Sequence, residues 1–234
     1  ENLFTPQEYH TMVIPPKCWP EEELRVLGGE EKITEAIENI ANIILKRPGE
    51  LWVQVYVGVL AGQNIPHLHY HINEPVKWSG DETEGERRLE EALDLSAESE
   101  LLTQLAESPL KLFREANLVV AVESIARVGQ CFIVPAEEWP LDQPRGSLPW
   151  LRSLARLLAK TTALYAKAFE SKQGLATEFQ LFFKFEGGCF IYGSYLPILN
   201  HLGSTETAGA LISGGPFIHP WSPEETLERL QQFV

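Results

Sequence analysis

The sequence predicts an α+β protein of two similar modules, each an antiparallel sheet with a helix packed on one face. Segments rich in β-branched and aromatic residues, the composition of strands, occur at 51–60, 117–125, 130–135 and 178–185. Apolar residues recur at helical spacing over 30–47 and 148–169. Because both halves combine such strands with one long amphipathic helix, we expect the two modules to pack as a pseudo-dimer.

The order of these elements divides the chain into three parts. The first module covers residues 1–75 and contains strands at 10–15, 51–60 and 66–72 around the helix at 30–47. Residues 76–108 are polar and acidic, with some helical character at 86–95, and form a connector. The second module covers 109–234 and ends in a helix over 224–233, for which Ser222 is the N-cap and Pro223 the first residue.

Short matches indicate that the second module repeats the first. Residues 13–15 (Val-Ile-Pro) match residues 133–135 (Ile-Val-Pro), and a Trp-Pro pair follows four residues later in both copies. A later strand begins with glutamate in each copy, at Glu50 and at Glu178. The elements also follow one another in the same order in both copies, which chance matches explain less well. We therefore infer a duplicated fold.

Three histidines occupy alternate positions in one short segment, His67, His69 and His71. In an extended chain alternate side chains lie on the same face. The chain has 6 His in total, so half of them are expected on one side of one strand. Aligning Pro66 with Pro197 replaces these histidines in the second module by Ile198, Asn200 and Leu202.

Three imidazoles on one face allow three interpretations. They can bind one metal ion and leave a coordination position open. One of them can act as a nucleophile while the others orient it and hold the reacting group. They can also form a structural cluster in which each ring has its own hydrogen-bond partner.

The residues around the histidines resemble the signature of the histidine triad nucleotide-binding proteins. Gly58 and then Ala61-Gly62-Gln63 precede the histidines at the spacing of that signature. Residues 9–15 (Tyr-His-Thr-Met-Val-Ile-Pro) are similar to the Gly-His-x-Leu-Val-Ile-Pro strand of the family. The two-copy arrangement is similar to the galactose-1-phosphate uridylyltransferases, which share this fold with the diadenosine tetraphosphate phosphorylases.

This resemblance implies an enzyme that transfers or hydrolyses a nucleotide at its α-phosphate through a nucleotidyl-histidine on His69. His67 and His71 would act on the leaving group and the phosphate oxygens. Gln63, Asn64 and His10 would bind the substrate, a small nucleotide or sugar-nucleotide, with neither metal nor cofactor. The alternative is a non-catalytic protein that binds a nucleotide or a metal with the same histidine face.

The sequence departs from the family pattern at three positions. Tyr56 stands where the family usually has an asparagine that contacts phosphate, and Asn64 stands where a hydroxylated residue is usual. The transferase branch typically has glutamine at the third histidine position. His71 in that place is similar to the hydrolase-like branch.

Composition narrows the class of partner. The 234 residues carry a formal net charge of −14, and a field of that sign disfavours non-specific binding to nucleic acid or to anionic membrane. No apolar run reaches the length of about 20 residues needed to span a bilayer. The 3 Cys are far apart in sequence, so we expect free thiols, a reducing compartment and a cytoplasmic protein. We also expect one chain to form the pseudo-dimer by itself.

Overall fold

The computed structural model describes residues 10–14, 49–58, 61, 69–73, 95–115, 117–123, 129–136, 148–169, 178–186, 189–198 and 222–234. The described strands are β1 His10–Val13, β2 Glu50–Val57, β3 Tyr70–Asn73, β4 Lys111–Glu115, β5 Leu118–Val122, β6 Cys131–Pro135, β7 Glu178–Glu186 and β8 Cys189–Ile198. The described helices are α4 Leu95–Glu107, α5 Leu148–Ala168 and α7 Pro223–Gln231. The helix predicted at 30–47 lies outside these residues.

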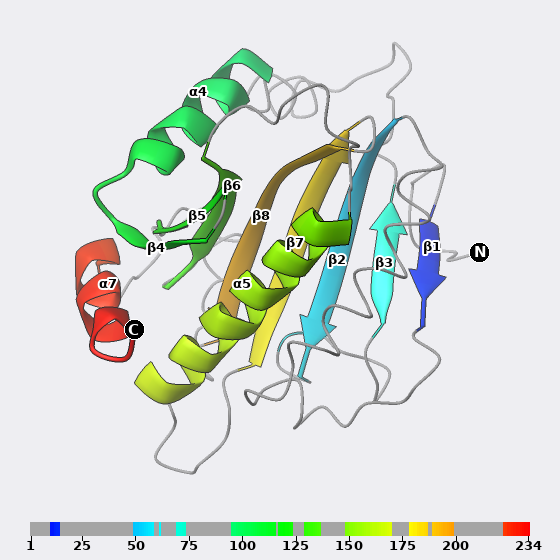
Figure 1. Cartoon of the computed structure of the whole chain (residues 1–234). Helices are drawn as coiled ribbons and strands as arrows, with labels where there is room; N and C mark the ends of the chain where they lie inside the picture. The colour runs from blue at the N-terminus through cyan, green and yellow to red at the C-terminus, as the bar shows by residue number, and fades with distance from the viewer. Residues whose placement is uncertain are drawn as a thin grey trace, which may run out of the picture.

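The described strands form one sheet of 8 strands in the order β1-β3-β2-β7-β8-β6-β5-β4, with α5 lying across one face (Figure 1). Every pair of neighbouring strands is antiparallel. The predicted α+β class with an antiparallel sheet is therefore confirmed. Strands from both predicted modules share this sheet, because β2 pairs with β7 along its whole length, from Glu50↔Glu186 to Val57↔Phe179.

The register of the strands shows which of the short sequence matches are consistent with one another. If Glu50 and Glu178 are equivalent, Gln54 corresponds to Phe182. The register of the next two strands on each side then makes Val13 equivalent to Ile133, as the match at 13–15 requires. The same pairing makes His71 equivalent to Ser194. This register differs by eight residues from the alignment of Pro66 with Pro197, which places His71 opposite Leu202, so the two sequence matches do not agree with each other.

One face of the sheet packs against α5. The odd-numbered residues of β2 are buried and the even-numbered ones are half-buried, which is the alternation of a strand with one face on a core. The buried residues share a hydrophobic cluster with Leu154, Leu158 and Tyr165 of α5. The apolar stripe predicted over 148–169 therefore corresponds to the side of α5 that packs on the sheet.

The opposite side of the sheet, which we call the distal face, is defined by one row of directly paired residues. Residues opposite one another on antiparallel strands project to the same side, and this row consists of Met12, His71, Gln54, Phe182, Ser194 and Phe132. At one end of this face, Leu105 of α4 packs against Phe132 and Val119. Neither α4, within the expected connector, nor β4, within the expected second module, was predicted from the sequence.

The last helix is fixed by its own sequence. Ser222 accepts a hydrogen bond from the Glu225 backbone N–H at 3.2 Å, and Glu225 accepts one from the Ser222 backbone N–H at 2.7 Å. This reciprocal pair is a capping box, and Pro223 occupies the first turn. The predicted N-cap and helix are confirmed. None of the described helices is both long and apolar enough to cross a membrane.

A thiol and a phenol meet in the core between the sheet and α5. Sγ of Cys131 lies 2.9 Å from the Tyr165 hydroxyl oxygen, and this hydroxyl donates a hydrogen bond to the Gly129 carbonyl. Both side chains are buried, with no exposed fraction. Burial raises the pKa of the Cys131 thiol to about 12 and raises the pKa of Tyr165 as well.

We expect the free energy of unfolding to decrease as the pH rises above about 9, the ordinary pKa of the thiol. The unfolded chain loses the Cys131 proton there, whereas the folded chain keeps it until about pH 12. The stabilisation is therefore complete below pH 9.0 and is lost toward pH 12, by up to about 1.4 kcal/mol per pH unit for the thiol. Urea unfolding at several pH values measures this slope, which should be shallower in Cys131→Ala. Equal slopes in both proteins would contradict the assignment.

Candidate active site on the distal face

Two of the three alternate histidines lie side by side. His69 directly precedes β3 and His71 lies within it, and their ring centroids are 4.9 Å apart with the ring planes inclined by 71°. His71 pairs with Gln54 of β2, so both imidazoles belong to the distal face. His69 is 2% exposed and His71 is half-buried. The pair can therefore contact a single small ligand, with His69 shielded from bulk water.

Tyr56 forms the next side of this site. Its ring centroid lies 5.7 Å from that of His71, edge to face, and its hydroxyl donates a hydrogen bond of 3.0 Å to Oε1 of Gln54. Burial raises the pKa of Tyr56, so the group remains a neutral donor at physiological pH. Where the resembling family usually has asparagine, this chain has a ring that packs on His71.

Side chains of β7 hold the turn that leads from β2 toward the histidines. The Ala61 N–H donates to Oε2 of Glu178 at 3.2 Å, and Nε2 of Gln180 donates to the Ala61 carbonyl at 2.7 Å. Gly58 has a φ of 103°, a conformation that glycine adopts without strain. A Cβ there would lie 2.3 Å from the Glu178 side chain. The turn therefore requires a glycine and two polar side chains from the other half of the sheet.

The remaining predicted site residues are only partly described. His67, Gln63 and Asn64 lie outside the described residues. The backbone of His10 belongs to β1 and pairs with Asn73, which places position 10 beside the histidine strand. The roles assigned to these residues and to the histidine pair stay predictions.

Sequence reasoning missed Glu178, Gln180 and Asn73. Glu178 and Gln180 bond to Ala61, more than a hundred residues away in sequence. A local sequence motif cannot predict such contacts. Asn73 is 4% exposed, and its Oδ1 is a buried acceptor with no hydrogen-bond partner. Its position two residues after His71 was the available signal, because alternate residues of a strand share a face.

Comparison with known proteins found similarity at the level of structure only. No family model matches the chain and no curated protein matches it by sequence. A uridylyltransferase structure superimposes with a TM-score of 0.60 at 18% identity, covering 88% of this chain and 68% of its own. A GalT-like protein from Arabidopsis thaliana gives a TM-score of 0.62 at 15% identity, with 99% and 78% covered.

An ADP-glucose phosphorylase from Arabidopsis thaliana, solved with bound ADP-glucose, gives a TM-score of 0.60 at 14% identity. This alignment covers 97% of this chain and 74% of the phosphorylase. The chain has the uridylyltransferase-like fold. The resemblance predicted from the histidine motif is confirmed at that level.

Within the described part of the uridylyltransferase-like fold, no group of three His, Cys, Asp or Glu side chains is arranged to hold a metal ion. His67 lies outside that part. The described polar side chains of the histidine pair and of the pocket lining beside it are two imidazoles, two phenols, a serine hydroxyl and glutamine amides. These groups suit hydrogen bonding and nucleophilic attack.

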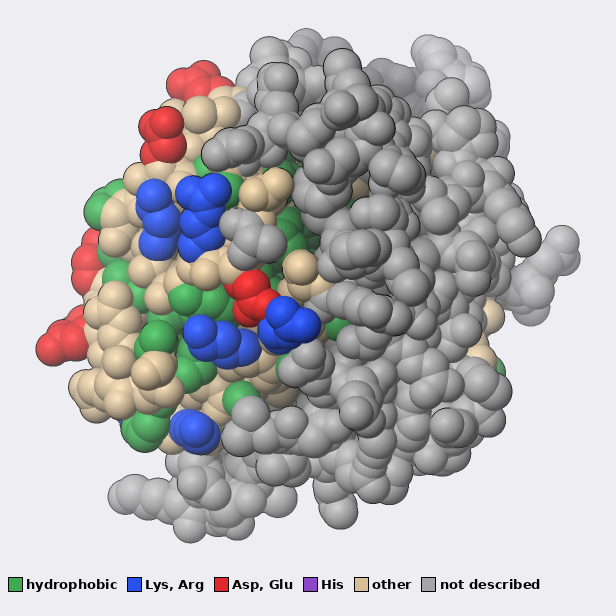
Figure 2. Space-filling view, viewed as in Figure 1, with side chains coloured by type: hydrophobic (Ala, Val, Ile, Leu, Met, Phe, Trp, Pro, Cys, Tyr) green, Lys and Arg blue, Asp and Glu red, His purple; other side chains and the backbone are tan. Residues whose placement is uncertain are grey.

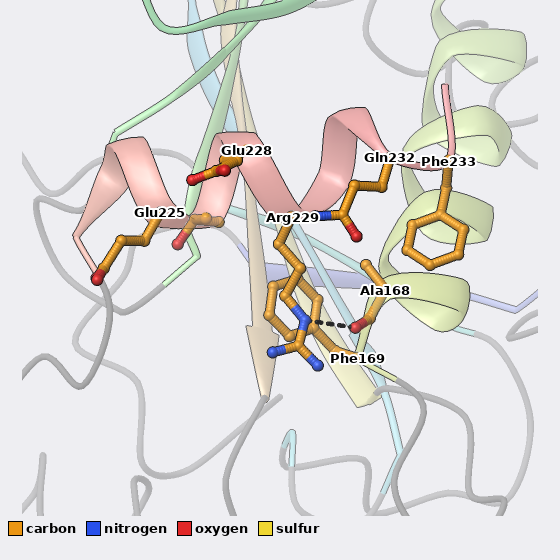
Figure 3. Close-up of a pocket in the computed structure, with 8 residues that line it drawn as sticks. Ala168, Phe169, Glu225, Glu228, Arg229, Gln232 and Phe233 are labelled. Atoms are coloured by element: carbon orange, nitrogen blue, oxygen red, sulfur yellow. Dashed lines mark hydrogen bonds between the residues drawn. The ribbon is translucent and has the colours of Figure 1, made fainter.

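A cavity of about 430 Å³ lies on the α5 side of the fold, between the end of α5 and α7 (Figure 3). Nε of Arg229 donates a hydrogen bond of 2.7 Å to the Ala168 carbonyl. Its guanidinium lies 4.9 Å from the centroid of the Phe169 ring. A cation that binds a last-turn carbonyl stabilises a helix C-terminus, so Arg229 fixes α7 to α5.

Lys and Arg side chains are prominent on the described surface seen from the α5 side (Figure 2). Arg156 of α5 forms an ion pair of 3.1 Å with Glu115 of β4, and the Lys160 ammonium lies 4.3 Å from the Phe113 ring centroid. These contacts connect α5 to β4. They lie on the other side of the sheet from the histidine pair.

Proposed function

We propose that the protein cleaves or transfers a nucleoside monophosphate from a nucleotide or sugar-nucleotide donor, with His69 as the nucleophile. The observation that carries this proposal is the His69–His71 ring pair, 4.9 Å apart, on the distal face of a uridylyltransferase-like fold. A shielded imidazole beside a second one suits attack on phosphorus, because imidazole is nucleophilic and uncharged near pH 7.

The proposed reaction has two steps. The neutral ring nitrogen of His69 attacks the α-phosphorus, a P–N bond forms, and the P–O or P–N bond to the leaving group breaks. The leaving group takes a proton from a neighbouring acid, for which His67 and His71 are the candidates. Water or an acceptor phosphate then attacks the phosphorus, a P–O bond forms and the P–N bond to His69 breaks. When water attacks, its proton goes to the group that protonated the leaving group, so both imidazoles are regenerated.

The proposal includes the arrangement of the chain. Residues 1–75 form the module with the working motif, 76–108 a connector, and 109–234 a second module without the histidines. Two findings support this arrangement. The strands β1, β3 and β2 mirror β6, β8 and β7 about the central pair, and the match between Val13 and Ile133 agrees with the pairing. The single chain would then form the pseudo-dimer.

Turnover by the full chain tests the proposal. We expect release of nucleoside monophosphate from a nucleoside 5′-phosphoramidate or from a sugar-nucleotide such as ADP-glucose or UDP-glucose, measured by liquid chromatography. Release with water alone identifies a hydrolase, whereas release that requires a sugar phosphate identifies a transferase. Absence of release under both conditions would contradict the proposed activity.

A second candidate is a nucleotide-binding protein without turnover, and Tyr56 favours it. Its ring packs on His71 at the position where the family usually has a phosphate-contacting asparagine. Such a protein would bind a nucleoside monophosphate in calorimetry and yet release nothing from either type of donor.

A further inference from the structure

A cavity of about 330 Å³ opens on the distal face beside the histidine pair. We call it the ring pocket. Its described lining comes from β2, β7, β8, β6 and the residue before β6, and consists of Gln54, Tyr56, Gln130, Phe132, Gln180, Leu181, Phe182, Tyr192, Ser194 and Leu196. Tyr56 also contacts His71, and His71 contacts His69, so the pocket lies next to the histidine pair.

Aromatic rings form much of the wall of the ring pocket. The ring centroid of Tyr192 lies 5.8 Å from that of Phe182 and 6.3 Å from that of Phe132. The Phe182 ring is in turn packed edge to face against Trp52, at 5.4 Å. Rings held by such neighbours lose little freedom when a planar ligand stacks on them. The pocket therefore favours a flat, aromatic group.

The polar groups of the ring pocket are side-chain amides and hydroxyls, and no charged side chain is among its described lining residues. Nε2 of Gln130 donates to the Ser194 hydroxyl at 2.8 Å. Gln54 accepts from Tyr56, and Gln180 donates to the Ala61 carbonyl. These bonds fix the amide planes, and a fixed amide presents both a donor and an acceptor to a ligand edge.

The ring pocket also occupies a particular place in the sheet. Strand pairing makes Ser194 the counterpart of His71, and Tyr192 precedes Ser194 as His69 precedes His71. The second half of the sheet thus carries a phenol and a hydroxyl where the first half carries two imidazoles. The distal face therefore carries the histidine pair on its first half and the uncharged lining of the ring pocket beside it.

We propose that the ring pocket binds the heteroaromatic base of the nucleotide, stacked on Tyr192 and Phe182 and hydrogen-bonded at its edge by the glutamine amides. The volume is at the lower end of the range of about 300–1,000 Å³ usual for ligand sites. Aromatic stacking with amide contacts to the base edge is a general mode of base recognition. The placement of the phosphate at His69 rests on the proposed function, whereas the base pocket does not.

Free nucleosides test the pocket without any phosphate. We expect at least one of adenosine, guanosine, uridine and cytidine to bind the full chain in isothermal titration calorimetry, with glucose as the comparison ligand. Leu196→Trp should fill the pocket and weaken that binding at least about tenfold. Ile198→Trp is the matched control: the same substitution two residues along the same strand, outside the lining, should leave binding unchanged.

Several results would overturn this proposal. They are absence of binding by all four nucleosides, equal binding by Leu196→Trp and the wild type, equal weakening by the control, and binding of glucose in place of nucleosides. If Leu196→Trp does not fold, Tyr192→Leu removes the stacking ring and should give the same loss. Nucleoside binding without turnover would contradict the proposed function and leave the pocket standing.

Discussion

The variant His69→Ala is expected to lose turnover of the nucleotide donor by about 10⁴-fold or more while it remains folded. Removing a nucleophile eliminates the covalent route, and what remains comes from binding and orientation alone. Because His69 is 2% exposed, alanine also leaves a cavity beside His71. His69→Asn fills more of that volume and should be equally inactive, which separates lost chemistry from lost packing.

Tyr70→Phe is the matched control for this variant. Tyr70 is the next residue along the chain but is buried on the α5 side of the sheet, in the core cluster. Removal of its hydroxyl should leave turnover within a few-fold of the wild type, provided that thermal unfolding shows a folded protein. Substantial turnover by His69→Asn, or equal losses in Tyr70→Phe, would contradict the assignment of His69 as the nucleophile.

The substitution Gly58→Ala should destabilise the protein and slow turnover together. A left-handed backbone with φ of 103° is strained for alanine by about 1–3 kcal/mol. The new Cβ would also lie 2.3 Å from Cγ and Cδ of Glu178, so that side chain must move and the bond from the Ala61 N–H is lost. Urea unfolding and donor turnover measure the two effects.

A control and a second variant separate the two causes of this loss. Gly49→Ala, just before the start of the same strand, meets no atom within 4 Å and should change stability by only a few tenths of a kcal/mol. Adding Glu178→Ala to Gly58→Ala removes the clash but not the strained φ, so it should recover only part of the stability. If Gly58→Ala were as benign as Gly49→Ala, the described turn would not constrain the site.

Elements whose determinants are local could be predicted from the sequence. The alternation in β2, the amphipathic stripe of α5 and the Ser222–Glu225 capping box each depend on a few neighbouring residues. α4 was missed because its apolar pattern is weak. Within 100–107, the part of α4 whose side chains are described, Leu105 is buried and Leu102 and Ala106 are partly buried, in an otherwise acidic and polar segment.

The same distinction between local and long-range determinants applies to the candidate site. The adjacency of His69 and His71 follows from the period of a strand, and the sequence predicted it. The contacts of Glu178 and Gln180 with Ala61 span 117 and 119 residues, and only the β2–β7 pairing creates them. The ring pocket likewise combines strands from both ends of the chain, so no segment alone could have predicted it.

The β2–β7 pairing also constrains how the protein can be divided. Each of these strands is interior to the sheet, and each has one neighbour from a distant part of the sequence. A polypeptide cut between them would present a long unpaired edge with alternating apolar residues, which invites self-association. Backbone contacts of such long sequence separation form late, because closing the intervening loop costs entropy before the contacts compensate for it. The two halves should therefore acquire their final structure cooperatively, as one folding unit.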